Sequence, residues 1–323
     1  MRSAVDYLSF RARDGVYRIL EALRPSFGTL ADCLTMSDDL PGVDGWKARR
    51  ALSLAGDVHI AFIDHGGEHM RDWARLDMSG SGCEWVQDWR VVEALPSRLT
   101  TPEIKRLDLQ VTTHDGSVTH DRVLAAFEAG AFRSPGAGRT PALTQYLSSD
   151  PTAGRTAYIG KRGQHKLGRF YEKGWEMLKD LPADVRRAVS TVAVDGVGMV
   201  PPDAVYRCEV EFRAKDGKVI PWQAVCSERD GHFAGAYPFC AELLEGVQPL
   251  RIAPVPQAAP RLELAIAMHH AARSYGGTIR AAYEAMGCDA EKVLALLMAA
   301  EPSRVLVESG ALTLAPGEFT HVD

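Results

Sequence analysis

The sequence predicts an α+β protein in which antiparallel sheets and flanking helices form a two-part body, followed by a small helical domain. Early segments alternate apolar and polar residues, a capped helical pattern follows them, and a proline-rich stretch precedes a helical end. The predicted domains are residues 1–248, with a long loop at 134–155, a linker at 249–260 and a helical appendage at 261–323.

Strand-like alternation marks the first third of the chain. The segments are 5–12, 51–64, 71–86 and 105–112. Each places an apolar side chain at every second position over most of its length, which is typical of an antiparallel sheet with one solvated face. A helix should follow, with Thr119 as its N-cap.

The rest of the body repeats this order of strands and helix. Residues 156–178 should form a hairpin with its turn at 162–164, and a short helix should begin at Pro182. A second hairpin is expected, with 205–215 as one arm and 219–227 as the other. The order suggests a two-part body, although no strong residue-level repeat supports an internal duplication.

Bulk composition is that of an ordinary folded protein. With 323 residues and 46% hydrophobic content, the chain can form a sizeable core. Charges interrupt the first twenty residues and no apolar run approaches the ~20 residues of a spanning helix, so we expect a cytoplasmic protein with no membrane partner. Six cysteines without a Cys-x-x-Cys pair disfavour a zinc knuckle and a disulfide framework.

Positive charge is concentrated in one segment of an acidic chain. The net charge is −5, yet residues 155–179 hold seven Lys or Arg against two Glu. A solvated basic face would explain this run, and so would a surface that tracks DNA phosphates. The candidate DNA-binding residues are Arg155, Lys161, Arg162, Lys166 and Arg169, with Arg207 and Arg213 from a later strand.

Two predicted strands place carboxylates between arginines. Asp108 lies on the polar face of 106–111, and Glu209 and Glu211 lie on the polar face of 206–213. A few carboxylate oxygens are what Mg²⁺ or Mn²⁺ needs beside a substrate phosphate. Alternating Arg and Glu on an exposed strand also form ordinary cross-strand ion pairs, so both interpretations stand at this point.

A tyrosine on the neighbouring segment completes the candidate site. Strand alternation over 167–173 groups Tyr171 with Arg169 and Lys173. A phenol with a pKa near ~10 is a weak nucleophile at neutral pH, and a nearby metal or cation would favour its ionised form. The alternative is that Tyr171 is a core ring. Tyr158 in the same block is a second candidate.

Several segments resemble, in order and style, the trans-acting replication initiation factors, the Rep_trans-type rolling-circle initiators of plasmids and filamentous phages. The similarity spans roughly residues 5–225. Its segments are VDYLSF, LDMSGSGCEW, RLDLQV, TAYIGKRGQHKLGRFYEKGWE and YRCEVEFRAK. The most specific part is the Tyr-Ile-Gly-x-Arg … Arg-Phe-Tyr-x-Lys block. The chain has no His-hydrophobe-His triplet, the metal motif of the other large initiator class, which favours carboxylate ligands.

The resemblance implies a metal-dependent, origin-specific DNA nickase and religase in a bacterial cytoplasm. It implies that Tyr171 attacks one strand and stays joined to the 5′ phosphate, with Lys173 as the basic residue beside it. Asp108 and Glu209 would be ligands of Mg²⁺ or Mn²⁺. Glu211 would be either a third ligand or the partner of Arg213.

The implied partners are origin DNA, both duplex and nicked single strand, a host helicase and a second copy of the chain. The helical appendage, with Thr278 as a cap and Gly287 as a stop, could read duplex DNA, dimerise or simply pack. Two other functions stay open. One is a DNA-binding or partner-recruiting protein that does not nick, and the other is a metal nuclease that uses activated water.

Overall fold

The computed structural model describes residues 1–133, 140–253 and 264–298, with side chains omitted for 264–270. Parts of the predicted loop 134–155, linker 249–260 and appendage 261–323 therefore lie outside the described residues. The chain divides into two compact units, Met1–Val255 and Pro256–Asp323, which we describe separately.

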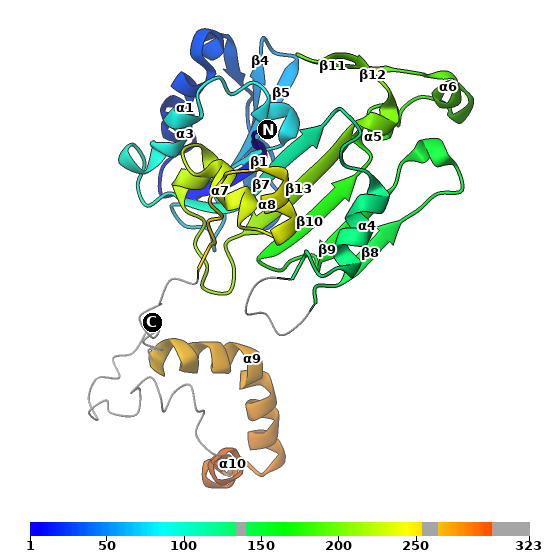
Figure 1. Ribbon diagram of the computed structural model, residues 1–323. Helices are drawn as coiled ribbons and strands as arrows, with labels where there is room; N and C mark the ends of the chain where they lie inside the picture. The colour runs from blue at the N-terminus through cyan, green and yellow to red at the C-terminus, as the bar shows by residue number, and fades with distance from the viewer. Residues whose placement is uncertain (134–139, 254–263, 299–323) are drawn as a thin grey trace. The chain divides into compact units, whose positions relative to one another are not determined.

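The first unit is built on one large antiparallel sheet (Figure 1). Over the described residues the sheet has eleven strands in the order β2-β4-β5-β6-β1-β7-β13-β10-β9-β8, with β3 paired to β4. Its strands are β1 (Ala4–Ala12), β2 (Leu34–Met36), β3 (Leu40–Pro41), β4 (Ala48–Leu54), β5 (Val58–His65), β6 (Ala74–Met78), β7 (Glu103–Thr113), β8 (Leu143–Tyr146), β9 (Thr156–Gly160), β10 (Lys166–Tyr171) and β13 (Tyr206–Arg213). A separate hairpin joins β11 (Val192–Val194) to β12 (Gly198–Val200). The predicted α+β fold with antiparallel sheets is confirmed.

Short helices connect and cover the strands (Figure 1). They are α1 (Val16–Leu23), η1 (Arg24–Cys33), α2 (Gly80–Cys83), α3 (Trp89–Glu93), η2 (Leu95–Ser97), α4 (His120–Glu128), η3 (Pro151–Ala153), α5 (Lys173–Glu176), α6 (Ala183–Ala188), η4 (Pro202–Ala204), η5 (Trp222–Val225), α7 (Arg229–Ala234) and α8 (Pro238–Leu243). Thr119 caps α4 as predicted, since its side-chain oxygen accepts a hydrogen bond from the Arg122 N–H.

The apolar face of the central strands forms the core of this unit. Leu109 of β7 lies opposite Val210 of β13, and both side chains are fully buried. Helix α8 closes this face, because the Phe239 ring packs edge-on against Phe170 of β10 at 5.9 Å between centroids. The other face of the same strands carries the polar residues, so the sheet has one apolar core face and one polar face.

Three predicted strand segments needed correction, and the first is 71–86, where β6 ends at Met78 and α2 follows. Residues 51–64 form two strands, β4 and β5, because Ala55 and Gly56 take positive φ and turn the chain. Residues 219–227 contain η5 in place of a hairpin arm, since Pro221 has no N–H to donate to a ladder. Ile220 keeps a strand-like bridge to Ile104.

The second unit contains α9 (Leu264–Ala285) and α10 (Ala290–Leu297). Thr278 lies within α9 and does not cap a helix, because the Gly pair before it is accommodated in a continuous helix. Gly287 follows the end of α9 with φ of 72°, and Asp289 caps α10 by accepting from two backbone N–H groups. Among the described helices, none is long and apolar enough to span a bilayer.

Candidate functional site

Four neighbouring strands bring the predicted site residues to one face. Glu209 of β13 lies opposite Arg169 of β10, and Arg169 lies opposite Tyr158 of β9. One register step away, Tyr171 lies opposite Arg207. Residues directly opposed in a sheet share a face, so both tyrosines and Glu209 project from the same side.

The acids of β7 and β13 form an adjoining group on this face. Asp108 lies opposite Glu211 on one side and Tyr7 of β1 on the other. Asp108 and Glu209 are thus neighbours along a diagonal, and only 1% and 4% of their surfaces are exposed. The structure therefore brings together Asp108, Glu209 and Tyr171, although in a buried setting.

Asp108 and Glu211 are already paired with arginines. Both oxygens of Asp108 accept from Arg106, at 2.9 Å to Nε and 2.5 Å to Nη2. Glu211 accepts from Arg213 at 2.5 Å and lies 3.1 Å from Arg106. Burial raises the pKa of Asp108 to about 6 against the lowering effect of the Arg106 guanidinium. Arg213 is a partner of Glu211, as one of the two sequence interpretations expected.

Glu209 is the least satisfied of these acids. Its Oε2 is buried and finds no hydrogen-bond partner among the described residues, and the nearest cation, Arg169 Nε, is 3.6 Å away. Burial raises the pKa of Glu209 to about 8, and the negative charges of Asp6 and Asp108 add to this effect. A buried carboxyl oxygen without a hydrogen bond is costly, which makes Glu209 a candidate position for a positively charged ligand.

The two tyrosines differ in access. Tyr171 is only 4% exposed, and the guanidinium of Arg169 lies 4.3 Å from the centre of its ring. Burial raises the pKa of Tyr171 to about 12, although Arg207 and Arg169 oppose the rise. Tyr158 is half-buried, and its ring contacts Tyr146 at 5.5 Å between centroids. Hence Tyr171 is buried and not ionised in this arrangement, whereas Tyr158 is partly exposed.

A cavity of about 290 Å³ lies beside both tyrosines. Its charged lining is internally paired: Arg155 bonds Glu172 at 2.8 Å, and Lys179 lies 3.4 Å from Glu176. The cavity can admit a nucleotide phosphate only if these pairs loosen, since each cation now has an anion beside it.

The predicted DNA-binding cations do not form a single stripe. Arg169, Arg207 and Arg213 project from the acidic face, whereas Lys166 projects from the opposite face, beside the Tyr237 ring at 4.0 Å. The reason is strand alternation, which separates Lys166 from Arg169 by an odd number of residues. Lys161 and Arg162 lie in the turn between β9 and β10.

The predicted place of Lys173 on the Tyr171 face was wrong. Strand β10 ends at Tyr171, and Lys173 begins α5, where its Nζ lies 2.5 Å from Glu176. Next to Lys173, Gly174 packs against Pro202 so closely that an added Cβ would lie 2.1 Å from the Pro202 carbonyl oxygen. Lys173 therefore stays near the tyrosine in sequence but belongs to a helix.

Two residues of β1, Asp6 and Tyr7, also lie at the candidate site and were not predicted from the sequence. A β-bulge between Val5 and Tyr7 changes the alternation, and Asp6 then bonds Arg207 at 2.8 Å. The Tyr7 hydroxyl donates to Asp77. The signal was the spacing of the buried residues, because Val5 and Leu8 are three positions apart and cannot share a face of a regular strand.

The residues present suit a hard divalent cation in their chemistry. A cation at Glu209 would satisfy its buried oxygen and offset the charges of Asp6 and Asp108. Within the described part of the chain, however, no group of three or more His, Cys, Asp or Glu residues is already arranged to hold a metal ion. Arg106 would first have to release Asp108, so an incoming ion would depend first on Glu209.

Residues 102–258 match the family model of the replication initiation factors. This segment contains the acids of β7 and β13 and both tyrosines. No curated protein matches the chain. Among solved structures, the chain is similar to the rolling circle replication initiator protein from Geobacillus stearothermophilus, with 17% identity and a TM-score of 0.51, covering 78% of this chain and 98% of that one. The resemblance seen in the sequence is confirmed.

Proposed function

We propose that the chain is a rolling-circle replication initiator that nicks and rejoins one origin strand through a 5′-phosphotyrosine intermediate. The observation that carries this proposal is the convergence of Tyr171, Glu209 and Arg169 on one face of β10 and β13. A phenol, a carboxylate with a free buried oxygen and a guanidinium are the groups that phosphoryl transfer to tyrosine requires.

In the proposed step, the Tyr171 hydroxyl oxygen attacks the phosphorus of the scissile phosphodiester. A bond forms between that oxygen and phosphorus, and the bond from phosphorus to the 3′ oxygen breaks. The phenol proton passes to water in the cavity, and the 3′ oxygen takes a proton from water to become the 3′ hydroxyl. Reversal of the same step rejoins the strand.

Arg169 has two roles in this proposal. In the resting protein it covers the Tyr171 ring, and a phosphate entering the cavity would draw the guanidinium away from the ring. Arg207 lies opposite Tyr171 and can hold the second phosphate oxygen. Lys173, two residues further on, can neutralise the transferred phosphate once its pair with Glu176 opens. Tyr158, which lines the same cavity, is the alternative nucleophile.

Glu209, with Asp108 and Glu211, is proposed to hold Mg²⁺ or Mn²⁺. When bound, such an ion would polarise the phosphoryl group as a Lewis acid. The residues themselves provide the buried negative charge that attracts the ion and the arginines that position the DNA backbone.

The proposed partners are the duplex origin, the nicked single strand and a host helicase, within the bacterial cytoplasm. Arg155, Lys161, Arg162 and Arg213 would contact DNA phosphates around the site, together with Lys166 on the opposite face. A second copy of the chain is also proposed, and light scattering of the purified protein tests this directly.

The deciding experiment incubates the protein with a supercoiled plasmid carrying its origin and Mn²⁺ or Mg²⁺. Relaxation with protein joined to the 5′ end supports the proposal. A free 5′ phosphate would instead indicate a nuclease that uses water, and binding without relaxation would indicate a recruiting protein. A plasmid lacking the origin is the control for specificity.

A further inference from the structure

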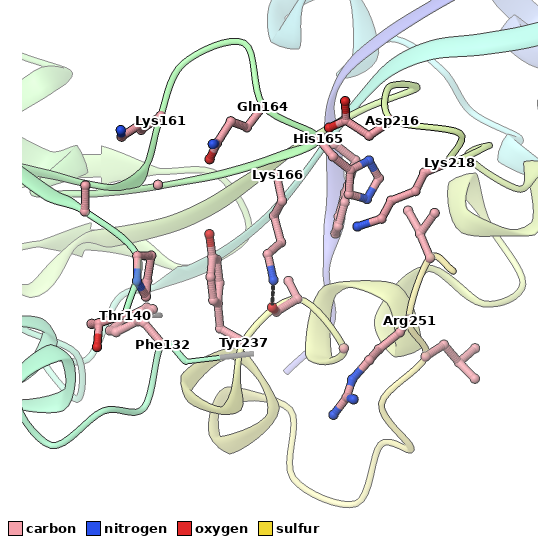
Figure 2. A pocket seen from close by; sticks show the side chains of 18 residues that line it. Phe132, Thr140, Lys161, Gln164, His165, Lys166, Asp216, Lys218, Tyr237 and Arg251 are labelled. Atoms are coloured by element: carbon pink, nitrogen blue, oxygen red, sulfur yellow. Dashed lines mark hydrogen bonds between the residues drawn. The ribbon is translucent and has the colours of Figure 1, made fainter. Parts of the chain in front are cut away.

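A second, larger pocket lies at the other end of β10. It has a volume of about 630 Å³, within the ~300–1,000 Å³ common for small-molecule sites. Its lining includes the turn from β9 to β10, the turn after β13 and the chain that follows α8, together with residues before β8 and between α7 and α8. Figure 2 shows Lys166 and Lys218 extending into the same space from different walls, with Arg251 below them.

Positive charge dominates the polar side of this pocket. Lys161, Lys166, Lys218 and Arg251 line it, against the single carboxylate of Asp216. Among the described residues, the side chains of Lys218 and Arg251 make no hydrogen bond or ion pair with protein. The Lys166 Nζ donates to the Ala236 carbonyl (Figure 2). Cations gathered without matching anions favour an anionic ligand.

The cations also affect one another. Burial lowers the pKa of Lys166 to about 8, and the positive charges of Lys218 and Arg251 lower it further. The same Lys218 charge lowers the pKa of His165, after burial as the larger cause. Repulsion of this kind is relieved when an anion enters, so the free protein holds a site whose charges are unbalanced.

The other side of the pocket is apolar. Pro141, Phe212, Leu250 and Ile252 line it. A bare inorganic anion would leave these side chains uncovered, whereas a ligand that joins a phosphate to a flat organic body would contact both sides. A nucleotide has this combination.

We propose that this pocket binds the phosphate of a nucleotide, through Lys218 and Arg251, with the sugar and base against the apolar side. The nucleotide is either free or one unit of a single DNA strand, since both present the same chemistry. The site lies on the face of β10 that carries Lys166, opposite the face of Tyr171, and is distinct from the proposed nicking centre.

Calorimetric titration of the full chain tests this proposal, with thymidine 5′-monophosphate as the probe and thymidine as the uncharged comparison. The monophosphate should bind and thymidine should not. The double variant Lys218→Gln, Arg251→Gln should bind the probe at least about tenfold more weakly, since two charge-assisted contacts are lost. The matched control, Lys47→Gln with Arg71→Gln, removes the same charge at exposed positions outside the pocket and should bind normally.

Equal affinity in both double variants, or equal binding of thymidine and its phosphate, would overturn the proposal. Competition between the probe and a short oligothymidine would assign the site to a DNA strand, and binding of the mononucleotide alone would assign it to a free nucleotide. Circular dichroism checks that the variants fold. Because Tyr171→Phe should keep the probe affinity, failure of the nicking proposal and failure of this one give different results.

Discussion

The two pockets beside the β9–β10 hairpin differ in how their charges are arranged. The smaller one, next to Tyr171, is lined by cations that already have partners, such as Arg155 with Glu172. The larger one, next to Lys166, contains Lys218 and Arg251, which have no protein partner among the described residues. One strand therefore serves a neutralised cavity on one face and an electropositive cavity on the other.

Because their charges are paired differently, the two pockets should respond differently to DNA. A paired cavity must exchange its internal ion pairs for contacts with the ligand, which gives selectivity because only a correctly placed phosphate compensates for the loss. An unpaired pocket needs no such exchange and attracts anions at rest. The first arrangement suits a reaction centre, and the second suits a holding site.

The strongest loss of activity should follow removal of the Tyr171 hydroxyl group from the smaller cavity. Tyr171→Phe should reduce formation of the covalent adduct at least about a thousandfold, because the attacking oxygen is lost. Tyr158→Phe, the matched control in the same cavity, should reduce the first nick no more than about tenfold. Denaturing gels of labelled origin DNA measure both. The reverse result would make Tyr158 the nucleophile.

The next prediction concerns the stability that depends on Gly174, which lies in α5 directly after the Tyr171 strand. Gly174→Ala should lower the free energy of unfolding by about 1–3 kcal/mol, since its Cβ would collide with the Pro202 backbone. Gly15→Ala, with open space around it, should change stability by about 0.5 kcal/mol or less. Urea denaturation checks both. A Gly174 variant as stable as wild type would mean that α5 can shift freely.

A metal effect should be confined to the acidic face. Saturating Mn²⁺ should raise the melting temperature of the wild-type protein by about 3–6 °C, because the ion binds the folded acids. Glu209→Gln should abolish this rise, whereas Glu128→Gln, at an exposed helix position, should preserve it. Differential scanning calorimetry gives the result without any cleavage assay. An unchanged rise in Glu209→Gln would exclude Glu209 as the anchoring ligand.

The smallest effect is a pH dependence in the larger pocket. Lys166 is charged below its pKa of about 8 and neutral above it, so affinity for thymidine 5′-monophosphate should fall several-fold between about pH 7 and 9. Of the groups facing Lys166, burial raises the pKa of Cys240 to about 12 and also raises that of Tyr237. Arg251 is a further cation that lines the pocket.

The remaining groups around Lys166 are Lys218, His165 and Asp216. The pKa of His165 is lowered by burial, so its ring is neutral throughout this pH range. The Lys166→Gln variant should therefore show a flat profile. Calorimetry at several pH values decides the matter, and a wild-type profile as flat as that of the variant would remove Lys166 from the binding site.

Much of the fold could be predicted from the sequence, because alternation reports directly on strands with one buried face. The strands containing Asp108 and Glu209 were placed well for this reason. Helices α7 and α8 were missed, since six residues are too few for a helical period to emerge; α6, equally short, was predicted from Pro182 and not from periodicity. The end of β10 at Tyr171 was also missed, because strand alternation over 167–173 gave no sign of it.

The sequence predicted which residues form the candidate site, but it did not predict how their charges are paired. Strand parity places Tyr171 with Glu209, whereas the stacking of Arg169 on Tyr171 depends on packing that no spacing reveals. The pairing of Asp108 with Arg106 lies within one strand, whereas the sequence predicted ion pairs between strands, such as that of Arg106 with Glu211. The larger pocket could not be predicted, because its cations come from three distant segments.

The bulge in β1 determines what a deletion near the start of the chain would remove. Since Val5 and Leu8 both reach the core across it, deleting one residue there would leave them two positions apart, the spacing at which residues of a regular strand share a face. Such a deletion would remove the bulge and keep the core contacts, whereas a substitution at Asp6 would remove one ion pair with Arg207. Related chains that lack the extra residue should therefore keep the same core and lose the outward place that the bulge gives to Asp6.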